Sequence, residues 1–240
     1  QGGQARRSAR TTMVVYCVLM PYRNVPPSTV LLGWYALLWG VLAVSPADWE
    51  NWVLASVIPA IVVVGLVAGR QALPMTCASY VMVGACLTLH TLGAHYTYAR
   101  TPPGHELGLL LGSGRNDYDR VVHFAFGLLL AMPIRECFAR LTNTRGVLLY
   151  YLPMMTIVGL SGLWEILEAW VAQSVSPELG AAYLGSQGDI WDSQKDMAAA
   201  LYGALLWLAL TLWARRRSAG VASDVAGDEP EETMSRAAPR

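Results

Sequence analysis

Two pairs of ionisable residues lie within or beside apolar segments at helical spacing. Asp119 and His123 are four residues apart, and Glu165 and Glu168 are three residues apart. Either spacing places both side chains on one face of an α-helix. Imidazole and carboxylate groups together bind Zn²⁺ or Mn²⁺, whereas a set dominated by oxygen suits Mg²⁺ or Ca²⁺. We therefore predict a divalent metal ion as cofactor, with Asp119, His123 and Glu165 among its ligands.

A third group of carboxylates precedes the last apolar segment. The stretch GDIWDSQKDM contains three aspartates that share one stripe if the stretch is helical: Asp189, Asp192 and Asp196. We expect these aspartates to complete the metal site. Helix capping is an alternative explanation for Asp192 and Asp196, as a place in the first turn of a helix is for Asp119.

Six apolar segments dominate the rest of the chain. Of its 240 residues 54% are apolar and 14% are charged, a composition that is unusual for a soluble domain. Each segment approaches the roughly 20 residues that a helix needs to cross a bilayer. The segments are residues 28–45, 51–69, 75–98, 119–137, 147–172 and 196–214. We predict an all-α, polytopic membrane helix bundle with about six transmembrane helices.

The distribution of basic residues predicts the orientation of this bundle. Lysine and arginine are concentrated on the side of the membrane that carries both chain ends, and cytoplasmic loops carry such an excess. We therefore expect cytoplasmic N- and C-termini in the inner membrane. Residues 1–27 are expected to form a cytoplasmic or interfacial lead-in, residues 28–217 the membrane domain, and residues 218–240 a disordered cytoplasmic tail. The balance of 17 basic and 17 acidic residues gives no reason to expect a nucleic-acid partner.

The ionisable residues fall at one depth in this topology, near the outer, periplasmic ends of the helices. A carboxylate that faces lipid costs about 2.5 to 3.5 kcal/mol, so Glu165 and Glu168 are expected to face the interior of the bundle. His90 and His95 are about 140° apart around a helix, so they cannot both face one centre. His95 lies nearer the outer end of its helix, so we expect His95 rather than His90 to belong to the site.

Four motifs in order resemble those of a known family. They are HTLGAHYTYAR (90–100), RNDYDRVVHFAFG (115–127), WEILEAW (164–170) and LGSQGDIWDSQKDM (184–197). Together they resemble the YjdF-like inner-membrane proteins, a domain of unknown function, and the resemblance covers about residues 28–217. It implies a six-helix membrane domain and no assigned reaction. More distantly, an Asp-x-x-x-His at a helix start, a glutamate in the next helix and an aspartate before the last are similar to VanZ-like proteins, which are associated with glycopeptide resistance.

These residues lead to a hypothesis of function. The chain is expected to be a metal-dependent hydrolase or transferase, in which the ion lowers the pKa of a bound water and Glu168 or His95 acts as general base. Arg115 and Arg120 would orient the anionic headgroup of a membrane lipid or a lipid-linked phosphate. The sequence contains no GxSxG motif, which argues against a serine hydrolase.

Two other functions stay open. A proton- or cation-coupled transporter would use Glu165, Glu168 and His95 as a relay. However, apart from Glu136 near the cytoplasmic end of the fourth segment, no acidic residue or histidine continues this relay toward the cytoplasmic half of the six segments. A non-catalytic membrane scaffold would use the same polar residues only to hold helices together through hydrogen bonds.

Overall fold

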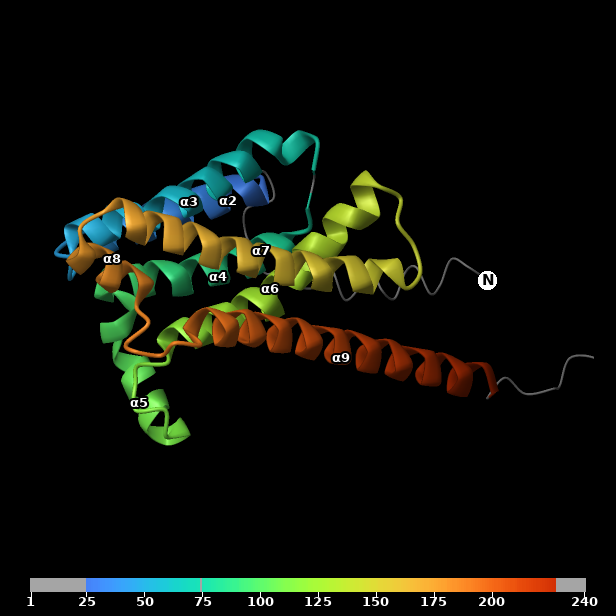
Figure 1. Cartoon of the computed structure of the whole chain (residues 1–240). Helices are drawn as coiled ribbons and strands as arrows, with labels where there is room; N and C mark the ends of the chain where they lie inside the picture. Colours follow the sequence, from blue (N-terminus) through green and yellow to red (C-terminus); the bar gives the residue numbers. More distant parts are fainter. Residues whose placement is uncertain (1–24, 74, 228–240) are drawn as a thin grey trace, which may run out of the picture.

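Helices are the regular elements of the described chain. The computed structural model describes residues 25–73 and 75–227, and within these ranges it contains helices and no strand. Figure 1 shows α2 (Pro27–Leu42), α3 (Trp49–Ala68), α4 (Cys77–Tyr96), α5 (Pro102–Leu111), α6 (Tyr118–Leu141), α7 (Leu148–Ser174), α8 (Pro177–Leu184) and α9 (Asp192–Gly227). Two short 3-10 helices, η1 (Gly69–Gln71) and η2 (Tyr98–Arg100), follow α3 and α4. The prediction of an all-α protein is confirmed.

Five of these helices are long and apolar enough to cross a membrane, namely α3, α4, α6, α7 and α9. The apolar helix α2 has only 16 residues and packs against α4 and α3. The prediction of about six membrane helices is therefore confirmed as five long spans and one shorter apolar helix. Cytoplasmic location of both termini stays a prediction.

The last helix is longer than the sequence pattern indicates. It begins at Asp192 and continues to Gly227, and so extends into the tail that was predicted to begin at residue 218. Disorder of that tail stays a prediction. This part of the chain contains no proline before Pro230 and several alanines, so the backbone can continue as helix. Residues 228–240 of the predicted tail, and residues 1–24 of the predicted lead-in, lie outside the described residues.

The two loops at the predicted outer end contain short helices that the sequence analysis did not predict. With 10 and 8 residues, α5 and α8 are too short to cross a membrane. Each has a proline in its first turn, and each ends at a glycine in the left-handed conformation, Gly112 and Gly185. These ends return the chain through residues 112–117 and 185–191 to the starts of α6 and α9.

The centre of the bundle is α6, which packs against α4, α7 and α9. Its most extensive contact is with α9, where glycines allow the backbones to approach closely. A side chain at Gly127 would overlap the carbonyl oxygen of Ala200, and one at Gly203 would overlap that of Phe124. Small residues at such contacts are typical of helices packed in membranes. This contact brings the outer ends of α6 and α9 side by side.

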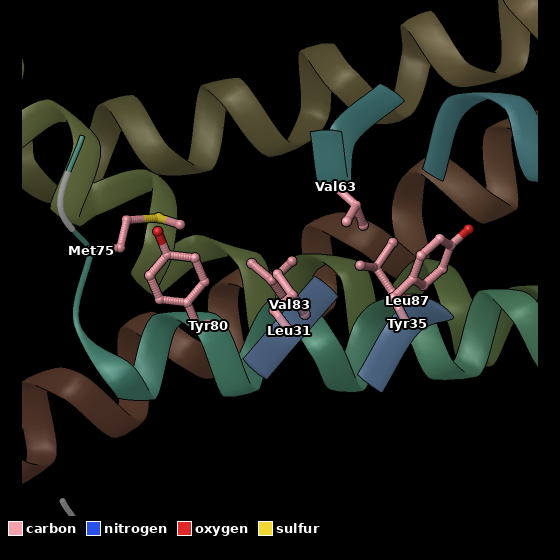
Figure 2. Close-up of a cluster of buried hydrophobic side chains, with 7 residues drawn as sticks. All are labelled: Leu31, Tyr35, Val63, Met75, Tyr80, Val83 and Leu87. Carbon is pink, nitrogen blue, oxygen red and sulfur yellow. The ribbon is translucent and has the colours of Figure 1, made fainter. Parts of the chain in front are cut away.

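A hydrophobic core joins α2, α3 and α4, and Figure 2 shows its seven buried residues: Leu31, Tyr35, Val63, Met75, Tyr80, Val83 and Leu87. The outer faces of the same helices remain apolar. Leu37 on α2 is 62% exposed, and Ile61 on α3 is 64% exposed. Helices that are apolar all around are typical of membrane spans, so these outer faces are suited to contact with lipid.

Candidate metal centre

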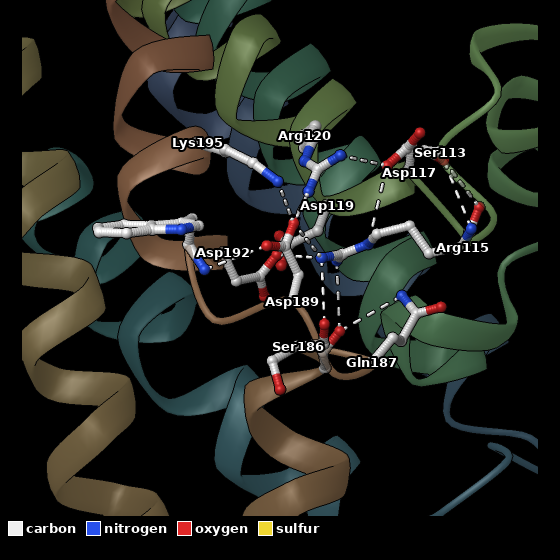
Figure 3. Close-up of polar contacts among 12 residues, drawn as sticks. Ser113, Arg115, Asp117, Asp119, Arg120, Ser186, Gln187, Asp189, Asp192 and Lys195 are labelled. Carbon is white, nitrogen blue, oxygen red and sulfur yellow. Dashed lines mark hydrogen bonds and ion pairs between the residues drawn. The ribbon is translucent and has the colours of Figure 1, made fainter.

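Charged residues gather at the end of the bundle where α6 and α9 begin, and they form two separate groups. The first group, here the ion-pair network, contains three basic and three acidic residues: Arg115, Asp117, Arg120, Asp189, Asp192 and Lys195. Figure 3 shows these side chains pointing toward one another from the loop before α6, from α6 itself, and from the segment that leads into α9. The formal charges within this group balance.

The network is centred on two aspartates that share the same basic residues. Arg120 lies 2.8 Å from Asp117 Oδ1 and 2.6 Å from Asp189 Oδ2. Lys195 Nζ lies 2.7 Å from Asp189 Oδ2, and its donation lowers the pKa of Asp189 to about 2. Asp189 also accepts from the backbone N–H of Trp191 at 3.1 Å. Asp189 therefore stays ionised, and it holds the turn that precedes α9.

Arg115 connects the two outer loops. Its guanidinium pairs with Asp192 and donates to the carbonyl oxygen of Ser186 at 3.1 Å. Beside it, the side chain of Gln187 accepts from the backbone N–H of Asn116 at 2.9 Å and donates to the carbonyl oxygen of the same residue at 3.0 Å. Arg115 is only 8% exposed, so most of its donors face protein rather than solvent.

Four residues that the sequence analysis assigned to the site form ion pairs within the network instead. Arg115 and Arg120 were expected to orient an anionic headgroup, but aspartates already surround both guanidinium groups. Asp189 and Asp192 were expected to bind metal, but both are paired with basic residues. Asp189 also precedes α9 and so is not on its helical stripe. The basic residues thus neutralise the carboxylates nearest to them. This arrangement does not favour the predicted roles of these four residues, which stay predictions.

The second group, here the carboxylate cluster, consists of Asp119, His123, Glu165 and Asp196, from α6, α7 and α9. One ligand atom each from Asp119, His123 and Asp196 lies within 4.8 Å of the others. Nε2 of His123 lies 3.3 Å from Glu165 Oε1 and 3.7 Å from Asp119 Oδ1. Among the side chains that the structure describes, no lysine or arginine forms an ion pair with this cluster.

Two buried oxygens of the carboxylate cluster lack a hydrogen-bond partner. They are Oδ1 of Asp196 and Oε1 of Glu165, for which no described protein group acts as donor. Asp196 is only 1% exposed. Buried polar atoms are almost always hydrogen-bonded, and a buried carboxylate needs either a proton or a cation. The cluster therefore has the donor set and the unsatisfied oxygens that a cation site requires.

The orientation of His123 suits metal binding through Nε2. Its Nδ1 lies 3.2 Å from Oγ of Ser161, which is 1% exposed. If the ring proton is on Nδ1, it is donated to Ser161, and the lone pair of Nε2 faces the carboxylates. Metal-binding histidines almost always donate their second ring N–H to such a partner.

The positions of the other histidines correct the choice between His90 and His95. Nδ1 of His95 bonds the carbonyl oxygen of Leu42 at 2.7 Å, and its ring packs against Trp52, which places it on the α2 and α3 side of the bundle. His90, in contrast, lines the same cavity as Asp119 and His123. The two histidines point in different directions, as their angle of about 140° around the helix predicts. However, α4 is oriented so that His90, rather than His95, faces the carboxylate cluster. The role of His95 as general base for the cluster stays a prediction, which its position on the α2 and α3 side does not favour.

Glu168 lies on the same helix as Glu165 and accepts from Nε1 of Trp164 at 2.7 Å. The Trp164 ring also packs edge-on against His90, with 5.5 Å between ring centroids. Nδ1 of His90 lies 2.6 Å from the hydroxyl of Tyr98, and Nε2 of His90 lies 2.9 Å from the carbonyl oxygen of Ala55. Both nitrogens of His90 thus have partners, which makes it part of the wall rather than a ligand.

The sequence analysis missed two residues of this region. Asp117 is 1% exposed and pairs with both arginines of the network. Its signal was the alternation of charge in RNDYDR. Ser161, the partner of His123, lies four residues before Glu165, so helical spacing could have placed it on the same face. Hydroxyl groups are common in membrane helices, however, and spacing by itself does not identify this one.

The geometry of the cluster is compatible with several divalent ions. Ligands around a tetrahedral Zn²⁺ lie about 3.3 to 3.6 Å apart, given bonds of about 2.0 to 2.2 Å, whereas Ca²⁺ binds oxygens at about 2.3 to 2.6 Å with flexible geometry. The observed limit of 4.8 Å is wider than a Zn²⁺ site. The three side chains would therefore approach one another on binding an ion, and by less for Ca²⁺ than for Zn²⁺.

Comparisons with known proteins agree with the membrane architecture. Residues 27–217 match the family described as "Predicted membrane protein (DUF2238)". The inner membrane protein YjdF of Escherichia coli (strain K12) is 37% identical over 165 residues, which cover 68% of this chain and 78% of that protein. No solved structure matches the chain. The resemblance to YjdF-like proteins is confirmed, while similarity to VanZ-like proteins stays a prediction.

Proposed function

The chain belongs to the DUF2238 family of predicted membrane proteins and is a multi-pass protein of the inner membrane, and we propose that it binds a divalent metal ion at the carboxylate cluster. We further propose that the ion supports hydrolysis or headgroup transfer on a lipid-linked phosphate. Asp119, His123 and Asp196 would hold the ion, with Glu165 as a fourth ligand.

One observation carries this proposal. The ion-pair network uses its three basic residues on Asp117, Asp189 and Asp192, and no lysine or arginine of the described chain pairs with the carboxylate cluster. The unpartnered Oδ1 of Asp196 lies in the cluster, in a residue that is almost fully buried. A divalent ion would neutralise these carboxylates and supply the missing partner, whereas the cost of burying them without a cation is high.

The chemistry follows from the ion and its surroundings. A bound divalent ion lowers the pKa of a water ligand toward neutrality and polarises a phosphoryl oxygen. Glu168, one turn from Glu165 and held by Trp164, is the carboxylate that could accept a proton there. Arg115 and Arg120 have a different part in this scheme, because they hold the outer loops over the cluster.

A transporter receives less support. Below His90 and His123 the cavity beside the cluster is lined by apolar side chains, Cys86 and Cys137, and its described lining contains no further acidic residue, histidine, lysine or arginine. A proton or cation relay across the membrane needs such groups at several depths. A scaffold without metal is the alternative that the following experiment distinguishes.

The test is the metal content of the full chain, purified in detergent and equilibrated with Zn²⁺, Mn²⁺ or Ca²⁺. We expect about one ion per chain in the wild type, and loss of most of it in Asp196→Asn. Asp189→Asn is the matched control, because it removes a carboxylate of the network from the same segment and should retain the ion. Elution as a single species and an unchanged helical spectrum establish that each variant is folded.

Two outcomes would contradict the metal site. The wild type could bind none of the three ions, or folded Asp196→Asn could bind as much as the wild type. If metal is bound, release of phosphate or headgroup from labelled polyprenyl phosphates and phospholipids tests the enzyme. If the protein binds metal but turns over neither substrate class, the proposed reaction is contradicted and the proposed metal site is not.

A further inference from the structure

An apolar cavity of about 400 Å³ begins beside the carboxylate cluster and lies between α3, α4, α6 and α7. Its polar groups are at one end, where His90, Tyr98, Asp119, His123 and Ser161 line the wall. Apart from cysteine, the remaining lining consists of apolar side chains. The cavity therefore combines a polar head with an apolar body, as a membrane lipid does.

The cavity extends through most of the membrane. Along α6 its lining runs from Asp119 to Cys137 at intervals of three or four residues, which is one face of the helix. The 18 steps from Asp119 to Cys137 correspond to about 27 Å at 1.5 Å per residue. The hydrocarbon core is about 30 Å thick, so the chains of one leaflet occupy only about half of that depth. An ordinary acyl chain would span only part of the length of the cavity.

The cavity opens toward lipid between α3 and α7. These helices both line it but do not pack closely against each other. Val62 on α3 and Leu160 and Leu163 on α7 line the cavity and are also 42%, 43% and 48% exposed. Side chains that are both lining and exposed form the rim of an opening. This rim faces the surface on which lipids would lie, so a chain could enter sideways.

We infer that this cavity binds a single long hydrocarbon chain, as in a polyprenyl-type lipid phosphate, with the phosphate end at the carboxylate cluster. The volume lies at the lower end of the range for small-molecule pockets, which favours one chain over the two chains of a phospholipid. The placement of the phosphate rests on the proposed function, because an acidic cluster attracts a phosphate only through a metal ion. Binding of the chain does not depend on it.

The test uses a polyprenyl phosphate that carries a photoreactive diazirine in its chain, added to the full-length protein in detergent. We expect crosslinks to map inside the cavity, at residues such as Leu130 and Ile134, rather than on exposed faces such as Ile61. Val83→Phe should reduce the yield several-fold, because Val83 is buried on the wall about 10 Å below His90. Val81→Phe on the same helix is the control, since Val81 is 56% exposed and does not line the cavity.

A second pair of variants covers the case in which Val83→Phe does not fold. Val62→Phe narrows the rim at an exposed position, and Val64→Phe places the same side chain outside the cavity on the same helix. We expect reduced crosslinking for the first and wild-type crosslinking for the second. Equal yields in the members of both pairs, or crosslinks only on exposed faces, would overturn the inference.

Two further readouts separate this inference from the proposed function. A diazirine-bearing phosphatidylglycerol should label the cavity weakly, and labelling as strong as that of the polyprenyl phosphate would contradict a site for one long chain. Metal content is measured on the same variants and should not change in Val83→Phe. Crosslinks in the cavity of a protein that binds no metal would support the binding site for the hydrocarbon chain and contradict the metal site. Bound metal without crosslinks in the cavity would support the metal site and contradict the binding site for the chain.

Discussion

His123 uses its two ring nitrogens toward different kinds of group, and this division is the main residue-level feature of the site. Nε2 faces Asp119 and Glu165, while Nδ1 lies against the hydroxyl of Ser161. A serine in this position can fix the tautomer without adding charge. The six charged groups of the ion-pair network lie at the same end of the bundle, yet they pair among themselves and leave this histidine to the carboxylates.

At this scale we predict that Ser161→Ala weakens metal binding by about 10- to 100-fold, the usual effect of removing a partner that orients a metal-binding histidine. The affinity is measured by titrating the metal-free protein with Zn²⁺ or Mn²⁺. Ser174→Ala is the control on the same helix, because Ser174 only donates to the carbonyl oxygen of Trp170 at an exposed site. An affinity in Ser161→Ala equal to that of the control would show that Ser161 does not orient the ligand.

At the scale of elements, α6 and α9 determine whether the cluster can form. They carry three of its four residues, and their spacing is set by Gly127 and Gly203 rather than by large side chains. On both helices alanines continue the contact, and Ala131, Ala200 and Ala204 are completely buried. A change in this spacing would therefore move Asp119 and His123 relative to Asp196.

We predict that Gly127→Ala lowers the free energy of unfolding by about 1 to 3 kcal/mol, because the added methyl group overlaps the carbonyl oxygen of Ala200. Metal affinity should fall in the same variant. Gly159→Ala is the control, since no atom lies within 4 Å of the added carbon, and helix propensity favours alanine by up to about 1 kcal/mol. The free energy of unfolding and the metal affinity are both measured in detergent. If Gly127→Ala changes neither, the close approach of α6 and α9 at Gly127 is not required.

At the scale of the whole molecule, both short loop helices lie at the end of the bundle that carries the charged groups (Figure 1). Basic residues lie at the other end: Arg70 and Arg145 beyond the ends of α3 and α6, and Arg140 in the last turn of α6. An excess of basic residues indicates the cytoplasmic side. The carboxylate cluster and the polar end of the cavity are therefore expected to face the periplasm.

This orientation predicts the accessibility of introduced cysteines, with the native cysteines replaced by alanine. Ser113→Cys, in the loop before α6, should react with a membrane-impermeant maleimide in cells whose outer membrane is permeabilised. Thr142→Cys, at the end of α6, should react only after the inner membrane is also opened. Both positions are exposed, so the comparison depends on the side of the membrane. The reverse pattern would place the metal centre on the cytoplasmic side.

The sequence by itself determined the membrane class, the apolar helices to within a few residues except for the longer last helix, and the faces shared by Asp119 with His123 and by Glu165 with Glu168. These follow from composition and helical period, which are local properties. Only the tertiary structure decided which carboxylates remain without a basic partner, because that depends on loops that bring Arg115 and Arg120 to Asp189 and Asp192. It also decided that His90 rather than His95 faces the site, since period gives the angle between two residues but not the rotation of their helix against its neighbours.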